Sequence, residues 1–201
     1  MKAISVIKPL VFAAAALPAA ALVHGFYTSD LTANPGDYIT DQTGTWTLAC
    51  LFASLAITPI RRVTGWNDVI RLRRMLGLFA FFYVVLHLLT WVVFIHYFDA
   101  GFMVEDVFKR PFITVGMAAF LILLALAATS NRFSIRTLGR KWQSLHRLAY
   151  AAALLGVVHF WWLVKADITE PRRWAAGLVV LLGLRVWWVV QKRTAARTAP
   201  A

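Results

Sequence analysis

The chain has 201 residues, of which 60% are hydrophobic and 15% are charged, and its mean hydropathy is +0.67. Soluble domains average roughly 45–50% apolar and about 25% charged residues, so the composition excludes a soluble or disordered protein and indicates an integral membrane protein. The net charge of +12 does not indicate nucleic-acid binding, because the basic residues cluster in loops between apolar spans.

The length predicts about six transmembrane helices at roughly 20 residues per span, which leaves no segment for a soluble catalytic domain. In chain order, the predicted helices cover residues 4–27, 46–60, 74–97, 112–129, 144–165 and 174–190. The sequence shows no internal repeat and no low-complexity linker. Residues 1–201 are therefore expected to form one all-α domain, a six-helix transmembrane bundle.

The first predicted helix has an alternative interpretation as a cleaved signal peptide. Lys2 and Lys8 accompany an alanine-rich run, and residues 19–21 offer small side chains for cleavage. We expect a retained helix, because the apolar run is long enough to cross a membrane and five further spans follow it.

The loops between the predicted helices alternate in charge. Loops 61–73 and 130–143 are rich in arginine, whereas loop 28–45 carries three acids and neither lysine nor arginine. Of the nine acidic residues, only Asp68 falls on the arginine-rich side. The positive-inside rule therefore predicts that both termini are cytoplasmic and that loops 28–45, 98–111 and 166–173 lie on the outer side.

Two histidines are predicted inside the membrane at one depth. Imidazole in hydrocarbon is costly, and no intramembrane carboxylate is available as a partner, so these side chains are functional candidates. His87 lies 13 residues into the third predicted helix and His159 lies 15 residues into the fifth, and both helices enter from the cytoplasmic side. Neutral imidazoles on facing helices can bind a haem iron from both sides, which leaves no open position and favours electron transfer.

A third histidine, His146, is predicted at the cytoplasmic face. It precedes His159 by 13 residues, roughly 20 Å along a helix, which suits a second haem. However, the two rings would point some 220° apart around the helix axis. The matching positions on the third helix are Arg73 and Arg74 rather than a histidine. One haem is therefore expected, and a second is left open.

Three other polar residues have a less demanding interpretation. Cys50 lies in an apolar run and is expected to be a small buried hydrophobic residue. Because it is the only cysteine, iron–sulfur clusters are excluded. His24 and His96 lie near the outer ends of their helices. Both are expected to be interfacial histidines, and the alternative is a ligand or quinol contact.

Several sequence runs, in order across residues 40–190, resemble one bacterial family, MsrQ (also called YedZ). The wider relatives of that family are the ferric-reductase-like transmembrane domains. The runs that carry the resemblance are Thr43-Gly-Thr-Trp46, Thr58-Pro-Ile-Arg-Arg62, Arg73-Arg-Met-Leu-Gly-Leu78 leading to His87, Lys109-Arg-Pro-Phe-Ile-Thr-Val-Gly116, and Trp142-Gln-Ser-Leu-His-Arg-Leu148 leading to His159-Phe-Trp-Trp.

The resemblance implies a haem b subunit that takes electrons from the quinone pool of the bacterial inner membrane. It also implies binding of flavin mononucleotide (FMN) and electron transfer to MsrP. That partner is a periplasmic molybdopterin enzyme, which carries the catalytic site that reduces methionine sulfoxide in proteins. The family's ligand histidines fall on His87, His146 and His159. In the wider superfamily the third and fifth helices each carry two histidines, a pattern from which this chain departs.

Three cations lie where the membrane topology does not explain them. Lys109 and Arg110 lie on the outer side, against the positive-inside bias. They are expected to anchor the chain at the interface or to bind haem propionates or an acidic patch on the partner. Arg185 lies inside the sixth predicted helix, where it could snorkel or bind a propionate, a flavin phosphate or a quinone.

A group of arginines is predicted around His146 at the cytoplasmic face. Arg74 and Arg147, together with Arg73 and Arg140, could hold a flavin phosphate or the phosphates of membrane lipid. The sequence does not separate these two ligands.

Two other functions compete with the haem interpretation. A polytopic transporter of a solute or metal would use the histidines for its substrate and would not require His87 and His159 at one depth. In a scaffold without redox chemistry, the histidines would only tie helices together.

Overall fold

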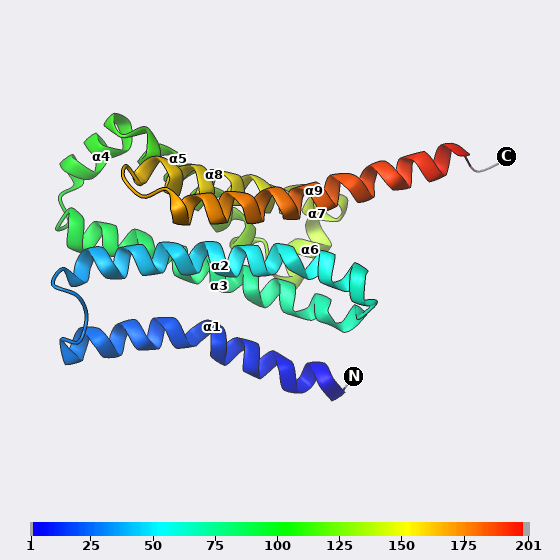
Figure 1. Ribbon diagram of the computed structural model, residues 1–201, viewed down its shortest axis with the longest axis horizontal. Helices are drawn as coiled ribbons and strands as arrows, with labels where there is room; N and C mark the ends of the chain where they lie inside the picture. Colours follow the sequence, from blue (N-terminus) through cyan, green and yellow to red (C-terminus); the bar gives the residue numbers. More distant parts are fainter. Residues whose placement is uncertain (1, 199–201) are drawn as a thin grey trace.

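The computed structural model describes residues 2–198, and within that range the chain is entirely helical with short connections (Figure 1). The elements in chain order are α1 (Lys2–Thr28), α2 (Pro35–Thr64), the 3₁₀ turn η1 (Asn67–Val69), α3 (Ile70–Thr90), the π-helical segment η2 (Trp91–Ile95), α4 (Ala100–Lys109), α5 (Pro111–Ala128), α6 (Arg132–Leu138), α7 (Arg140–His146), α8 (Leu148–Leu163) and α9 (Thr169–Thr198). The all-α prediction is confirmed.

Helix α2 begins 11 residues earlier than predicted, at Pro35 rather than at residue 46. The prediction followed hydropathy alone, and the polar first turns of the helix were assigned to loop 28–45. Asn34 caps the helix by accepting a hydrogen bond from the Asp37 amide, and proline is well suited to the first helical position. Two of the three acids in that predicted loop, Asp37 and Asp41, therefore lie on the helix.

Two other predicted loops also contain helices. Loop 98–111 contains α4, and loop 130–143 contains α6 and the start of α7. The predicted helix 144–165 is wrong as one continuous element, because a turn at Arg147 separates α7 from α8. Among the described residues, the only π-helical segment is η2, which extends α3.

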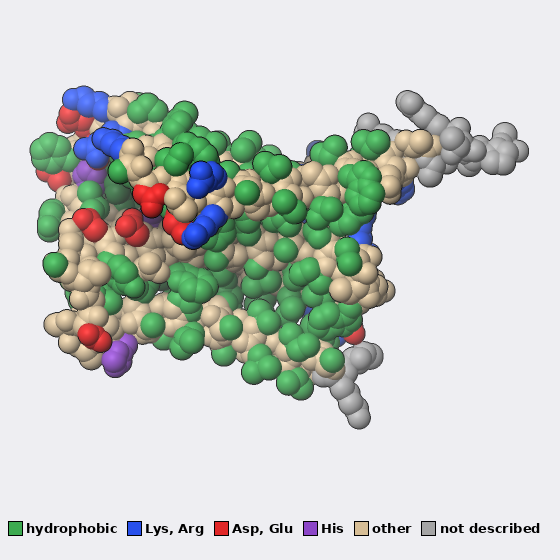
Figure 2. Space-filling model, viewed as in Figure 1, with side chains coloured by type: hydrophobic (Ala, Val, Ile, Leu, Met, Phe, Trp, Pro, Cys, Tyr) green, Lys and Arg blue, Asp and Glu red, His purple; other side chains and the backbone are tan. Residues whose placement is uncertain are grey.

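Five helices are long and apolar enough to cross a membrane by length and composition: the helical stretches of α1, α2, α3 with its flanking turns, α5 and α9. Helix α8, at 16 residues, is shorter than these, so the predicted count of six spans stays a prediction. Hydrophobic side chains cover the long sides of the bundle, and acidic groups gather at the end where α2 begins (Figure 2). The chain is a multi-pass membrane protein.

The helices have two distinct ends, which we name by their charged residues. The arginine end holds the α2–α3 connection, α6 and α7, and α1 begins and α9 ends there (Figure 1). The acidic end holds the α1–α2, α3–α4 and α8–α9 connections. At the arginine end Gly65, with φ of 71°, closes α2 in a left-handed conformation that glycine adopts without strain.

The core is built by antiparallel helices, α2 against α3 and α5 against α8. Small and aromatic side chains fill the space between the two pairs, and Ala80, Tyr83 and Ala153 are fully buried. Cys50 is 4% exposed, which confirms it as a buried residue. Helix α9 adds Leu178 to the same core.

Helix α1 is tied to α3 by a single tyrosine. The Tyr83 hydroxyl donates a hydrogen bond of 2.6 Å to the Ala15 carbonyl and accepts one of 3.2 Å from the Ala19 amide. Those two backbone groups would otherwise bond to each other in the helix ladder, so the hydroxyl is inserted into α1 one residue from Pro18. Ile4 adds an apolar contact near the arginine end.

Candidate functional site

His87 on α3 and His159 on α8 face each other across the bundle. Their ring centroids are 6.2 Å apart and their planes are inclined by 83°. Both residues are only partly exposed. The structure thus brings together the two histidines whose sequence depths match, from the two different helix pairs.

Each of these imidazoles is oriented by a backbone carbonyl of the neighbouring helix. His87 Nδ1 lies 2.9 Å from the Thr40 carbonyl oxygen, and His159 Nδ1 lies 2.7 Å from that of Phe112. A carbonyl only accepts, so Nδ1 of each ring donates its proton. In a neutral imidazole this leaves Nε2 with a free electron pair, the tautomer that binds a metal.

A glycine gives each imidazole access to its carbonyl. In an α-helix the carbonyl of residue 40 accepts from the amide of Gly44, and the carbonyl of residue 112 accepts from the amide of Gly116. Each glycine therefore lies beside the carbonyl that its histidine reaches. A Cβ on Gly44 would lie 3.1 Å from the His87 ring, and one on Gly116 only 2.7 Å from His159 Nδ1. Any larger residue would push the ring away from its acceptor.

The two halves of the site repeat one design. In each half, the histidine on the second helix of an antiparallel pair reaches a carbonyl on the first helix. The histidine lies 47 residues after the carbonyl, both for Thr40 and His87 and for Phe112 and His159. The glycine follows that carbonyl by four residues in both halves. The sequence shows no similarity between the halves that would have indicated this repeat.

The spacing of the rings fits a metal ion held between them. Two metal–imidazole bonds of about 2.0–2.1 Å, placed in line, separate the two bonding nitrogens by about 4 Å. Each ring centre lies about 1 Å behind its nitrogen, so the two ring centres should lie about 6 Å apart. The observed 6.2 Å agrees. No group of three or more histidine, cysteine or acidic residues suited to a metal occurs in the described residues, so the pair alone would supply the protein ligands.

His146 lies elsewhere, at the arginine end of the bundle. Its Nε2 is 3.1 Å from the Thr129 hydroxyl, and its ring stacks on Trp142 with centroids 3.9 Å apart. The Thr129 hydroxyl already donates to the Ala125 carbonyl at 2.7 Å, so it accepts from His146 Nε2. Burial, and next the Arg73 guanidinium, lower the pKa of His146 and favour its neutral form.

This hydrogen bond distinguishes His146 from the facing pair. Its Nε2 carries a proton, and it would have to give up the bond to Thr129 to bind a metal through that atom. The role of His146 as a metal ligand stays a prediction.

Three other arginines lie close enough to Arg185, at the arginine end, to act on its charge. Arg62, Arg73 and Arg147 act electrostatically on the Arg185 guanidinium, which lies 4.6 Å above the ring of Tyr150. We call these four residues the arginine cluster. No carboxylate within the described part of the chain forms an ion pair with any of them. Arg74, by contrast, is exposed and is not among the charges that act on Arg185.

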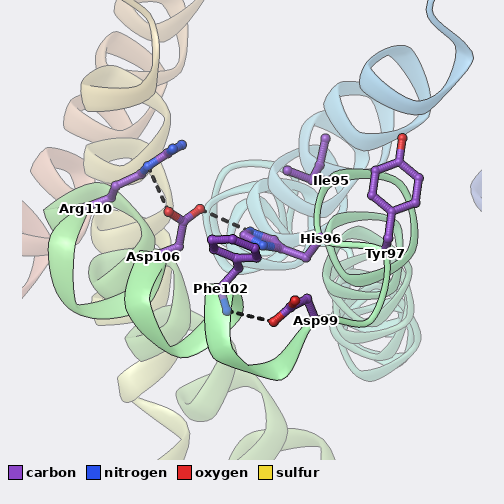
Figure 3. Close-up of a pocket in the computed structure, with 7 residues that line it drawn as sticks. All are labelled: Ile95, His96, Tyr97, Asp99, Phe102, Asp106 and Arg110. Carbon is purple, nitrogen blue, oxygen red and sulfur yellow. Dashed lines mark hydrogen bonds and ion pairs between the residues drawn. The ribbon is translucent and has the colours of Figure 1, made fainter.

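Lys109 and Arg110, at the acidic end, both have acidic partners on α4. Lys109 pairs with Glu105, and Arg110 Nε lies 3.1 Å from Asp106 Oδ1. The other Asp106 oxygen lies 3.1 Å from His96 Nε2, so Asp106 stands between Arg110 and His96 (Figure 3). His24 is exposed.

The chain is similar to curated proteins over almost its whole length. The family described as ferric reductase like transmembrane component matches residues 43–157. The chain is 50% identical to the protein-methionine-sulfoxide reductase heme-binding subunit MsrQ of Bordetella pertussis, over 98% of this chain and 96% of that protein. The chain belongs to the MsrQ family. Proteins of the same name from Herminiimonas arsenicoxydans and Rhodospirillum rubrum are 50% and 48% identical, over 95% and 93% of this chain and 89% and 90% of theirs. No solved structure matches it.

The sequence interpretation of this MsrQ-family chain missed the groups that orient the histidines. Gly44 and Gly116 appear in the runs that carry the resemblance, but no role was assigned to them. Their signal is visible afterwards: each precedes a histidine of the facing pair by 43 residues. The acceptors themselves, the carbonyls of Thr40 and Phe112, leave no trace in residue identity, because every residue carries a carbonyl.

Proposed function

We propose that this chain is a haem b electron-transfer subunit of the bacterial inner membrane. It would carry electrons from the quinone pool to a periplasmic molybdopterin reductase of the MsrP type, which repairs oxidised methionines in proteins. The observation that carries the proposal is the facing pair His87 and His159, with rings 6.2 Å apart and both Nε2 atoms in the metal-binding tautomer. The names of the relatives, which state heme binding, support it.

When bound, the haem supplies reversible one-electron chemistry at its iron. The chain's own residues fix the ligands. The Thr40 and Phe112 carbonyls hold both imidazoles in one tautomer and one orientation, which raises their basicity as ligands. With His87 and His159 both holding the iron, the haem would transfer electrons without binding substrate, and sulfoxide reduction would take place on the partner.

The charge pattern supports the predicted membrane topology. The arginine end would face the cytoplasm and the acidic end the periplasm, where the partner would dock. We place an FMN phosphate, which the family resemblance implies, at the arginine cluster, because four guanidinium groups without carboxylate partners suit a phosphate dianion. Arg185 and Arg147, two of the predicted residues, belong to this cluster.

The test is electron transfer through the purified, haem-loaded protein. A quinol analogue should reduce the haem, and MsrP with methionine sulfoxide should then reoxidise it, as followed by the b-type absorption band. His87→Ala and His159→Ala should each lose the band while the protein still inserts in the membrane. A protein with no such band, or one reduced by quinol but never reoxidised by MsrP, would contradict the proposal.

A further inference from the structure

A pocket of about 530 Å³ opens at the acidic end, between the end of η2 and helix α4 (Figure 3). Tyr97 and Phe98, with φ of 49° and 65°, take up the left-handed conformation that bulky residues adopt only under strain. This reversal turns α4 back across the end of η2. His96 therefore faces Phe102, Asp106 and Arg110 from the opposite wall.

His96 is the buried polar group of this pocket. Its side chain is 7% exposed, and Nε2 lies 3.1 Å from Asp106 Oδ2. The two groups are close but misaligned, so the buried Nε2 has no hydrogen-bond partner in the described structure. An unsatisfied buried polar atom costs about 1–3 kcal/mol, and a bound ligand is one means of satisfying it. The indole of Trp91, with its centroid 4.3 Å away, packs against the imidazole.

Asp106 is positioned to act as a base beside that nitrogen. Its side chain is 16% exposed, and Arg110 Nε lies 3.1 Å from its second oxygen. The guanidinium fixes the orientation of the carboxylate through the ion pair. One carboxylate oxygen therefore remains directed at the imidazole side of the pocket (Figure 3).

The pocket adjoins the facing histidines along two chain segments. His96 follows His87 by nine residues of continuous helix, roughly 13 Å along the axis. Arg110 is two residues from Phe112, whose carbonyl orients His159. A second pocket of about 560 Å³, lined by Arg110 and Phe112 with Leu163 and Lys165, shares Arg110 with the first.

We propose that the pocket bounded by His96, Asp106 and Arg110 binds the head group of a membrane hydroquinone and takes up the protons released on its oxidation. The inference rests on the proposed function and deepens it by locating the electron donor. The hydroquinone loses two electrons and two protons and leaves as quinone. A haem held by His87 and His159 would supply the one-electron acceptor, and reoxidation by the partner after the first electron would let it accept the second. The Asp106 carboxylate and His96 accept the protons and release them at the acidic end.

The chemistry of the pocket favours a hydroquinone over other donors. The ring of a hydroquinone is apolar and can pack against Phe102, while the two hydroxyls of the hydroquinone can donate to Asp106 and to an acceptor nitrogen of His96. Two aromatic residues of the lining, Tyr97 and Phe102, are 80% and 63% exposed, and Phe98, next to Tyr97 in sequence, is 69% exposed. An isoprenoid tail can lie against them at the membrane surface. A donor that carries a phosphate would be repelled, because the Asp106 carboxylate lines the pocket.

The experiment compares two neighbouring carboxylates in the purified, haem-loaded protein. Asp106→Asn removes the base and keeps the side-chain size. The matched control is Glu105→Gln, which removes an exposed carboxylate that pairs with Lys109 outside the pocket. The first readout is the stopped-flow rate of haem reduction by decyl-ubiquinol. The second, which needs no turnover, is photolabelling of the wild type and of His96→Gln by an azidoquinone, mapped by mass spectrometry.

We expect Asp106→Asn to slow reduction about 10²-fold, the lower range for loss of a general base. Glu105→Gln should change the rate less than about threefold, as expected for an exposed ion pair. Label should map to residues 95–110 and fall in His96→Gln. An unchanged rate in Asp106→Asn, or label at the arginine cluster instead, would overturn the inference. Reduction by dithionite distinguishes failure of this inference from failure of the proposed function. If dithionite does not produce a b-type spectrum, the protein holds no such haem and the proposed function itself is refuted.

Discussion

Gly116 provides the sharpest test of how His159 is held. A Cβ at this position would lie 2.7 Å from His159 Nδ1 and 2.9 Å from Cε1, whereas ordinary contact begins at 3.4 Å. In Gly116→Ala the ring must therefore withdraw by about 0.7 Å, which stretches its 2.7 Å bond to the Phe112 carbonyl to about 3.4 Å, outside the normal range.

The expected loss is in haem affinity rather than in folding. Weakening a hydrogen bond behind a metal-binding histidine typically lowers metal affinity about 10–100-fold. The helix itself should gain, because replacing glycine by alanine at a compatible position stabilises a protein by about 0.4–1 kcal/mol. A drop in haem binding without a drop in thermal stability of the haem-free protein is thus the specific signature.

Two other glycines provide comparison variants. The haem affinity of each variant is measured by titrating haem into the haem-free protein. Gly44→Ala should weaken binding less, because its Cβ would approach the His87 ring to only 3.1 Å. Gly183→Ala meets nothing within 4 Å and should bind like the wild type. Wild-type affinity in Gly116→Ala, or equal losses in all three variants, would refute the account of how the imidazole is positioned.

Three further predictions concern the rest of the chain. Tyr83→Phe removes the hydroxyl inserted into α1 and should lower the free energy of unfolding by about 1–3 kcal/mol, seen as a reduced thermal midpoint in detergent with an unchanged haem spectrum. An unchanged midpoint would show that the Ala15 carbonyl and the Ala19 amide bond to each other once the hydroxyl is gone. In intact cells, a membrane-impermeant thiol reagent should label Asp37→Cys and not Arg136→Cys, and the opposite pattern would reverse the topology. His146→Ala should keep the spectrum of the haem held by the facing pair, and loss of all haem would place His146 in that site.

Hydropathy and histidine depth were enough to predict the bundle and its facing pair. Apolar spans follow from composition, and two histidines at one depth on helices that enter from the same side must come close if those helices are neighbours. The same method failed at α2 and α4. Their first turns are polar or amphipathic, and the capping residues Asn34 and Asp99, rather than hydropathy, determine where they begin.

The remaining features depend on contacts between distant segments. Arg110 was expected to anchor the chain at the interface or to bind an anion, and the contact of its partner Asp106 with His96 forms only because α4 folds back over η2. The arginine cluster likewise draws residues from three helices and from the turn between α7 and α8, and Arg74, next to Arg73 in sequence, points elsewhere because neighbours on a helix lie about 100° apart.

The central claim is that His87 and His159 bind one haem iron from its two sides. The most direct measurement is the reduced-minus-oxidised spectrum and haem content of His87→Gly and His159→Gly, with and without added imidazole. Each variant should lose the b-type band, and imidazole, which can occupy the vacated ligand position, should restore it. Full haem retention in either variant without imidazole would contradict it.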